Sequence, residues 1–342
     1  MKAKNEIKNI DKKSQKKAII KVRNLEVTFP IRQGNVIALD DINLDIYQGE
    51  TIGIVGESGC GKSTLGFSLL NSIQSPGRIT RGEIYFHDEN ILNKTKKEIQ
   101  RIRGKQISMI FQDPMTSLNP LLRIDKHIIE TIRKHEKNVS KKEALDRAVY
   151  LLDKLGIVRN RLFDYPHQLS GGMRQRVMIG IGLALNAEVL IADEPTTSLD
   201  VIVEAQFINL LNQLKDDFGI TLILITHNMG IVAEISDRIA VMYGGKIMEI
   251  GDSRLVFKDP LHPYTQGLLK SIPNIALDDN SIEPMPGFPP DLLNPPKGCR
   301  FAPRCKYAME KCFNEVPPVF EYRERLVSCF LYEKKEINHG KT

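Results

Sequence analysis

LSGGMRQR at residues 169–176 and VLIADEPTTSLD at residues 189–200 are the two patterns that decide the fold of this chain. The apolar run Val189–Ala192 is typical of a strand buried on both faces of a parallel sheet. Two adjacent carboxylates, Asp193 and Glu194, follow at its end. The first pattern sets a hydroxyl and two glycines at the start of a helical segment, where free backbone N–H groups can bind an anion. Together they predict an α/β protein with a nucleotide-hydrolysing site.

A complete phosphate-binding loop of the form G-x-x-x-x-G-K-[ST] lies upstream. The apolar strand Ile52–Val55 precedes it and a helical pattern follows, which is the context that such a loop needs. We expect Lys62 to reach the β- and γ-phosphates of ATP, and the hydroxyl of Ser63 to bind Mg²⁺. The expected nucleotide-binding residues of the loop are Gly56, Glu57, Ser58, Gly59, Cys60, Gly61, Lys62, Ser63 and Thr64.

Five separated motifs in this order resemble the ATP-binding subunits of ABC transporters, specifically those of the oligopeptide/dipeptide importers. They are the phosphate loop, FQDP at residues 111–114, LSGGM at residues 169–173, the Asp193-Glu194 pair and His227. The resemblance covers nearly the whole chain. It implies an ATPase that converts ATP to ADP and phosphate, and uses the energy to drive import.

The resemblance also implies roles for the polar residues at the strand ends. Asp193 would hold Mg²⁺ through its water shell, and Glu194 would be the general base that activates water. Gln112 would bind Mg²⁺ or the attacking water. His227 follows the apolar strand Thr221–Thr226, so it should emerge at the carboxyl edge of the sheet, near the γ-phosphate.

Two further contacts with nucleotide are expected from the family. Phe29 is the candidate for stacking on adenine, and its alternative is a place in the core of a sheet. Ser170, Gly171 and Gly172 would cap the ATP held by an opposite subunit, with Asp200 in a loop that crosses to that subunit. Leu199 stands where the family more often has alanine. One signature and one phosphate loop per chain predict half of a two-site, head-to-tail dimer.

The domain organisation follows from composition and periodicity. We expect a flexible Lys-rich tail at 1–18, an ATPase domain at 19–268 and a Pro-rich C-terminal domain at 269–342. The predicted fold class is α/β: a P-loop NTPase core with an antiparallel β subdomain, an inserted helical subdomain at about 114–180, and a small irregular appendage. Twelve of the eighteen prolines lie from Pro260 onward, which argues against long helices or central strands there.

Composition and charge limit the class and partners of the protein. The charged and apolar fractions are those of a globular domain, and no uncharged apolar run approaches the ~20 residues that span a bilayer. Much of the formal charge of +6 comes from seven lysines within residues 1–17. No aromatic residue is interleaved with these lysines to stack on bases, so we expect a solvated tail and no nucleic-acid partner, with contact to anionic lipid headgroups as the alternative.

The expected location is the cytoplasmic face of the membrane, as a peripheral subunit. The expected partners are two integral-membrane subunits, a second ABC ATPase subunit and, indirectly, an external substrate-binding protein. A heterodimer is favoured because peptide importers of this group commonly have two different ATPases, and a homodimer stays possible. Oligosaccharides or nickel are the alternative cargoes. A non-transport ABC ATPase is a further alternative, disfavoured because the chain has no second motif set and no sustained heptads.

Four of the five cysteines cluster in the appendage: Cys299, Cys305, Cys312 and Cys329. A cytosolic chain rarely keeps disulfides, so the cluster indicates a metal. The spacing C-x5-C-x6-C-x16-C is wider than that of the usual zinc knuckle. The resembling peptide-importer ATPases have a similar set that holds an iron–sulfur cluster, so we expect a [4Fe–4S] site, with zinc or free thiols as alternatives. Cys60 is expected to be a small packing residue.

Overall fold

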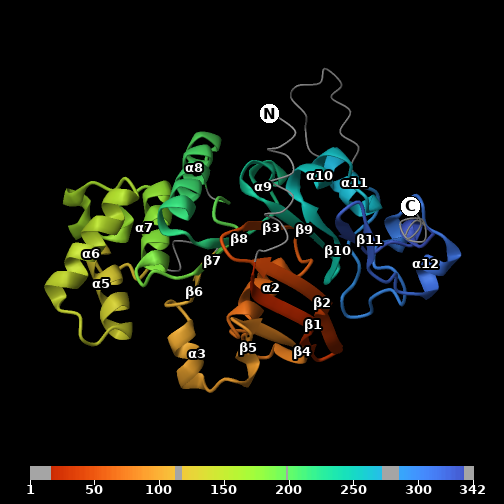
Figure 1. Ribbon diagram of the computed structural model, residues 1–342, viewed down its shortest axis with the longest axis horizontal. Coiled ribbons are helices and arrows are strands. Elements are labelled where there is room, and N and C mark those ends of the chain that lie inside the picture. The colour runs from red at the N-terminus through yellow and green to blue at the C-terminus, as the bar shows by residue number, and fades with distance from the viewer. Residues whose placement is uncertain (1–16, 112–117, 198, 272–284, 335–342) are drawn as a thin grey trace.

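The computed structural model describes residues 17–111, 118–197, 199–271 and 285–334. Gln112 lies outside these ranges. Figure 1 shows a large sheet crossing the middle of the molecule, with a smaller antiparallel sheet beside it. A group of helices lies at one end and the C-terminal region at the other. Among the described residues, the longest apolar helices all fall short of what crossing a membrane requires.

In the described chain, the large sheet has the strand order β11-β12-β10-β9-β3-β8-β7-β6. Its central pairs are parallel: β3 with β8 and β9, and β7 with β6 and β8. The strands are β3 (Thr51–Val55), β6 (Ile107–Ile110), β7 (Val189–Asp193), β8 (Thr221–Thr226), β9 (Arg238–Tyr243), β10 (Lys246–Asp252), β11 (Phe320–Tyr322) and β12 (Arg325–Val327). The predicted strands at 189–192 and 221–226 are therefore confirmed, and they are parallel as expected.

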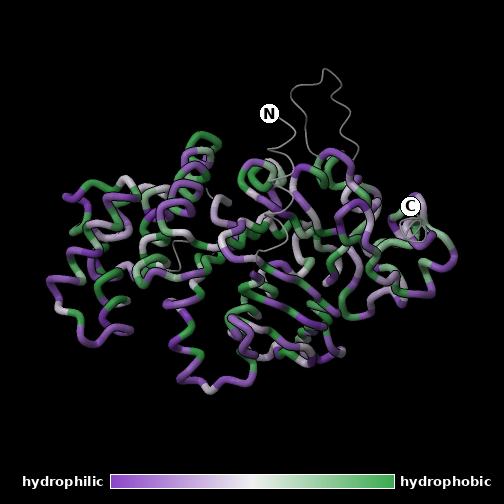
Figure 2. Tube along the Cα trace, in the orientation of Figure 1, coloured by the Kyte–Doolittle hydropathy of each residue, from purple (hydrophilic) through white to green (hydrophobic). Residues whose placement is uncertain are grey.

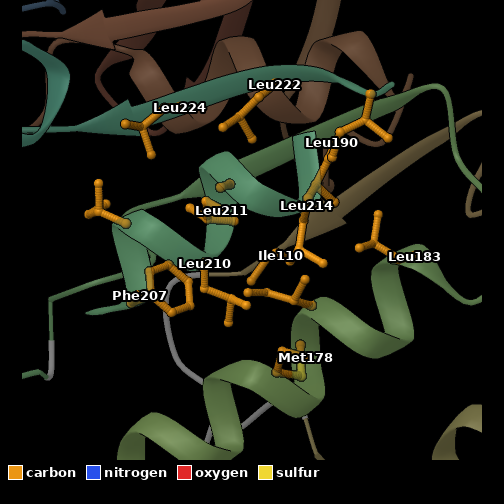
Figure 3. Packing of buried hydrophobic residues seen from close by; sticks show 14 of the residues in the cluster. Ile110, Met178, Leu183, Leu190, Phe207, Leu210, Leu211, Leu214, Leu222 and Leu224 are labelled. Atoms are coloured by element: carbon orange, nitrogen blue, oxygen red, sulfur yellow. The ribbon is translucent and has the colours of Figure 1, made fainter. Parts of the chain in front are cut away.

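Successive residues of the central strands point into two separate hydrophobic clusters, one on each face of the sheet. On β7 and β8, Leu190, Leu222 and Leu224 belong to the cluster that packs under helix α8 (Val201–Phe218). Figure 3 shows these leucines facing Phe207 and Leu211 of α8. Their neighbours in the sequence, including Ile191, Ile223 and Ile225, belong to the other cluster, with α2 (Lys62–Leu69). Figure 2 shows the resulting hydrophobic centre of the sheet.

The smaller sheet has the order β2-β1-β4-β5, all antiparallel. It consists of β1 (Ala18–Ile31), β2 (Gly34–Tyr47), β4 (Arg78–Phe86) and β5 (Glu89–Asn90). Its inner face packs into the same hydrophobic cluster as α2. The predicted antiparallel β subdomain is confirmed: β1 and β2 pair with each other, and β4 and β5 extend the sheet. α3 (Lys96–Ile102) then leads to β6.

The helical region contains α5 (Ile124–His135), α6 (Lys141–Lys154) and α7 (Gly171–Leu183). Ser140 caps α6: its hydroxyl accepts from the N–H of Glu143, and the carboxylate of Glu143 accepts from the N–H of Ser140. Gly156 follows the helix at a φ of 68°, which suits glycine. The S-x-x-E pattern at residues 140–143 thus begins α6 with a capping box, and a glycine follows its end.

The last part of the described chain contains α9 (Met229–Ile235), α10 (Ser253–Lys258), α11 (Pro263–Lys270), the short α12 (Glu310–Asn314) and the β11–β12 hairpin. β9 and β10 form an antiparallel hairpin, but this hairpin is not the edge of the sheet. β12 pairs with β10, at Glu249↔Val327 and Ile250↔Leu326, and so continues the sheet. Without the appendage, backbone groups on the outer edge of β10 would have no partner in the sheet, and β12 supplies it.

A core substitution tests the packing of α8 on the sheet. Leu211 is 0 % exposed and lies between the sheet and α7. Leu211→Ala should lower the free energy of unfolding by about 2–5 kcal/mol, because it removes buried methyl groups and leaves a cavity. Gln213→Ala, on the exposed side of the same helix, is the matched control. Equal denaturant midpoints for the two variants would contradict the described packing of α8.

Candidate functional site

The parallel register brings three loops to one edge of the sheet. Val55 pairs with Thr226, and Asp193 pairs with Ile225. The residues that follow, Gly56, Glu194 and His227, therefore leave neighbouring strands at nearly the same level. The N–H of Glu194 donates to the carbonyl of Ile225 at 2.8 Å, which fixes the start of its loop. These are the carboxyl ends of the strands, where open α/β sheets bind ligands.

Glycine is required at two positions of the phosphate loop. Gly56 has a φ of 153°, and a Cβ there would lie 2.1 Å from the carbonyl oxygen of Met242. Gly61 has a φ of 103°, and a Cβ there would lie 2.5 Å from the carbonyl oxygen of Ala38. Both positions combine left-handed backbone with close backbone approach, so only glycine fits without strain. The loop can thus curl against its neighbours and leave its N–H groups for an anion.

Lys62 stabilises the curl of this loop from inside. Its side chain is 4 % exposed, and its Nζ donates to the carbonyls of Gly56 at 2.9 Å and Glu57 at 3.1 Å. An ammonium group with two carbonyl partners is held in place while it keeps a donor for a phosphate oxygen. The positive charge therefore lies where the phosphate loop predicts it.

Ser63 and Asp193 meet across the site. The hydroxyl of Ser63 donates to Oδ1 of Asp193 at 3.0 Å. Burial raises the pKa of Asp193 to about 6, helped by the charge of Glu194 and opposed by Ser63 and Lys62. A buried carboxylate beside a hydroxyl at the end of a phosphate-binding loop fits the oxygen ligands that Mg²⁺ prefers. The cation would favour the ionised carboxylate.

Glu194 is held in an unusual backbone conformation. Its φ is 45°, which costs of order 1–3 kcal/mol for a residue with a side chain and is found most often at functional sites. Thr197 donates from its hydroxyl to Oε2 of Glu194 at 3.1 Å, and Nδ1 of His227 lies 3.3 Å from the same oxygen. A carboxylate fixed in this way can accept a proton from water held between it and a phosphate.

A cavity lies over the phosphate loop, lined by residues of the predicted site: Ser58, Gly59, Gly61, Lys62, Ser63, Thr64, Glu194 and His227, with Ala38 of β2 in addition. Cys60 is 5 % exposed and does not line it, and burial raises the pKa of its thiol to about 11. Cys60 therefore packs under the loop. Phe29 does not line the cavity either: it pairs with Val36 and its ring packs beside Gly77.

The signature residues lie at another surface of the chain. Ser170 is the exposed cap of α7, and its hydroxyl accepts from the N–H of Met173. A Cβ on Gly171 would have open space around it, whereas one on Gly172 would contact Val203 of α8. Asp200 caps α8 in the same way, through the N–H of Val203. None of these residues lines the described cavity over the phosphate loop.

Sequence reasoning missed two groups that support the site. Gln175, buried in α7, donates its side-chain amide to the carbonyl of Pro195, directly after Glu194. Tyr264 accepts from the N–H of Glu57 at 3.0 Å. Gln175 lies within the quoted signature, but its type and position give no sign of this partner. Gln112, predicted to bind Mg²⁺ or water, lies outside the described residues.

The four appendage cysteines line one cavity, together with mostly apolar side chains that include Phe301, Phe330 and Leu331. Burial raises the pKa of Cys299 to about 11 and that of Cys329 to about 12, and charges on the neighbouring cysteines add to both shifts. The spatial cluster predicted from the sequence is thus present. Within the ranges the structure covers, however, no group of three or more histidine, cysteine or acidic side chains is arranged to hold a metal ion.

A phosphate loop, a serine–aspartate pair and a strained glutamate beside a histidine define a P-loop ATPase. Residues 39–197 match the ABC transporter family, and residues 248–312 match the C-terminal region of oligopeptide/dipeptide transporters. The oligopeptide transport ATP-binding protein OppD of Escherichia coli is 48 % identical over 319 residues, which cover 92 % of this chain and 94 % of that protein.

Other relatives agree. The dipeptide transport ATP-binding protein DppD of Lactococcus lactis is 46 % identical over 305 residues, covering 89 % of this chain and 87 % of that protein. A dimeric ATP-binding cassette in a post-hydrolysis state, bound to ADP and phosphate, has a TM-score of 0.62 and 29 % identity, over 69 % of this chain and 99 % of that one. The chain belongs to the ATP-binding proteins of ABC transporters, in the oligopeptide/dipeptide group.

Proposed function

We propose that this chain hydrolyses ATP to power the import of oligopeptides or dipeptides through a membrane channel. The observation that carries the proposal is the meeting of Ser63 with Asp193, and of Glu194 with His227, at one edge of the sheet. The names of the relatives, oligopeptide and dipeptide transport proteins, support the cargo. The described lining of the ATP cavity gives no information on the cargo, so this part of the proposal depends on the relatives.

The geometry of the described residues supports the roles proposed for Lys62, Ser63, Asp193, Glu194 and His227. Lys62 binds the β- and γ-phosphates, and Ser63 and Asp193 hold Mg²⁺, which neutralises phosphate charge when bound. Glu194 accepts the proton of the attacking water. His227 holds Glu194 and the γ-phosphate in line, because its Nδ1 already lies 3.3 Å from the carboxylate. Gln112 completes the proposed Mg²⁺ and water contacts.

The working unit is proposed to be a head-to-tail dimer. Ser170, Gly171 and Gly172 lie at a helix start away from the phosphate loop of their own chain, so a second subunit would bring its ATP to them. Asp200 would cross the interface nearby. The dimeric state of the related cassette supports this arrangement. Binding of ATP would join the halves and hydrolysis would release them.

We propose that the second half is a different ABC ATPase, and that the pair docks on two integral-membrane subunits at the cytoplasmic face of the membrane. An external binding protein would deliver the peptide to that complex. The family to which the chain belongs supports both the membrane subunits and the dimer. The pairing with a different ATPase rests on the resemblance alone.

The four cysteines are proposed to bind a [4Fe–4S] cluster that holds the appendage together. The support is that Cys299, Cys305, Cys312 and Cys329 line one small cavity with apolar walls. Such a cavity excludes water from a thiolate-bound cluster. The N–H of Met309 points at the sulfur of Cys312 at 3.5 Å, a hydrogen bond of the kind that tunes cluster sulfurs. A metal would also favour the thiolates, against the effect of burial.

Two substitutions separate binding from turnover. Glu194→Gln should keep ATP affinity and lower turnover by ~10²–10⁴-fold, because the amide keeps the shape and loses the base. Lys62→Ala should weaken ATP binding itself by roughly 10–100-fold, because a buried charged donor is lost. Nucleotide binding and phosphate release are measured on the same samples.

Exposed residues of the same types provide the controls: Glu130→Gln and Lys142→Ala, both in the helical region. Both controls should bind and hydrolyse ATP like the unchanged chain. Robust hydrolysis by Glu194→Gln would remove Glu194 from the role of base.

Reconstitution in lipid vesicles tests cargo and partners. With both membrane subunits, the binding protein and a related second ATPase, labelled peptide should accumulate only when MgATP is present. Uptake of an oligosaccharide or nickel instead, under the same conditions, would replace the peptide assignment. Assembly and transport with this chain as the only ATPase would exclude the heterodimer requirement.

Anaerobic purification tests the cluster. The protein should be brown, with broad visible absorption and about four irons per chain. Replacing any of Cys299, Cys305, Cys312 or Cys329 with serine should bleach it, whereas Cys60→Ser should keep the colour. A colourless protein with one zinc, or with no metal, would contradict the cluster.

A further inference from the structure

Arg304 reaches from the cysteine-bearing appendage into the phosphate loop. It lies one residue before Cys305, and its side chain is 6 % exposed. Its Nη1 donates to Oε2 of Glu57 at 2.8 Å and to the hydroxyl of Tyr243 at 3.1 Å, while its Nε donates to the carbonyl of Pro286 at 2.7 Å. The guanidinium is therefore fixed by three partners, one of which is the second residue of the phosphate loop.

Glu57 is held at its backbone as well as at its side chain. Its N–H donates to the hydroxyl of Tyr264, and its carbonyl accepts from Lys62. Tyr264 is fully buried and packs against Tyr243 and Phe301, with ring centroids 4.5 Å and 5.4 Å away. The start of the phosphate loop is thus held by a cluster of aromatic rings, one of which, Phe301, comes from the appendage.

The charge of Glu57 makes this contact matter for nucleotide binding. Glu57 does not line the cavity over the phosphate loop, but the next residue, Ser58, does, so the charge of Glu57 lies one residue from the place where a polyphosphate would bind. A carboxylate near a polyphosphate weakens its binding unless a cation neutralises it. Arg304 is that cation, and because both side chains are largely buried, solvent screens the pair less than a surface ion pair.

The appendage segment that carries Arg304 also contacts β2, on the other side of the cavity. Arg300 donates from Nη2 to Oδ2 of Asp40 on β2 at 2.6 Å, and Lys246 pairs with the same carboxylate at 3.0 Å. Ala38, two residues earlier on β2, lines the ATP cavity. The segment between Cys299 and Cys305 therefore contacts residues next to the cavity on both sides, Glu57 in the phosphate loop and Asp40 on β2.

We propose that Arg304 is a positioning residue of the ATP site: by fixing and neutralising Glu57, it keeps the phosphate loop in the shape and charge state that bind ATP. The appendage is then part of the nucleotide site. This inference requires only that the chain binds ATP, and it is independent of the cargo and of the metal at the cysteines.

Binding of MgATP to the purified full-length chain tests the proposal. Arg304→Ala should raise the Kd for MgATP and the KM for ATP about tenfold, the loss expected for a buried charged hydrogen bond, with kcat changed much less. Arg304→Lys keeps the charge but loses the planar fork, so it should raise the Kd by only about threefold. Arg323→Ala is the control, since Arg323 pairs with Asp259 on the exposed side of the appendage.

A double-mutant cycle shows whether the effect passes through Glu57. With Glu57→Gln present, Arg304→Ala should cost far less affinity than it costs alone, because no carboxylate is left to neutralise. Equal losses in both backgrounds, or an unchanged Kd for Arg304→Ala, would overturn the proposal. If Arg304→Ala does not fold, Arg304→Lys is measured in the same cycle and the same outcomes decide.

Discussion

The parallel pairing of β3, β8 and β7 is the constraint on which the rest of the structure depends. Parallel strands deliver their carboxyl ends to one edge, so three segments far apart in the sequence meet there. A shift of the strand pairing by one residue would move every side chain of a strand to the opposite face of the sheet, and Asp193 would no longer lie beside Ser63. Leucines and isoleucines of these strands pack into separate clusters on the two faces, so a one-residue shift would exchange side chains of different shape between two close-packed cores.

Much of the fold and of the site could be predicted, because short sequence patterns determine the local structure of these segments. The phosphate loop needs glycines at set positions, and the strand runs and the capping box at Ser140 report structure through their immediate neighbours. The edge of the sheet could not be predicted in this way. β12 pairs with β10 across more than seventy residues, and strands of only three residues are too short to show a periodicity.

Long-range side-chain contacts were also beyond the sequence. Arg304 and Glu57 are 247 positions apart, and each is unremarkable in its own segment. Phe29 is a different case. The resemblance to the family predicted that its ring stacks on adenine, whereas the structure shows the ring packed beside Gly77. An exposed or half-buried aromatic does not reveal from its neighbours which surface it will face, so such assignments need the assembled site.

The buried pair of Glu249 and Arg325 joins β10 to β12, with both side chains at 1 % exposure or less. Glu249 also accepts from the N–H groups of Leu261 and His262, which precede α11. The nucleotide-binding core and the appendage consequently share one sheet and one buried polar network. They cannot be exchanged between transporters as separate modules at the proline-rich boundary, because a core taken alone would carry a bare sheet edge and a stranded carboxylate.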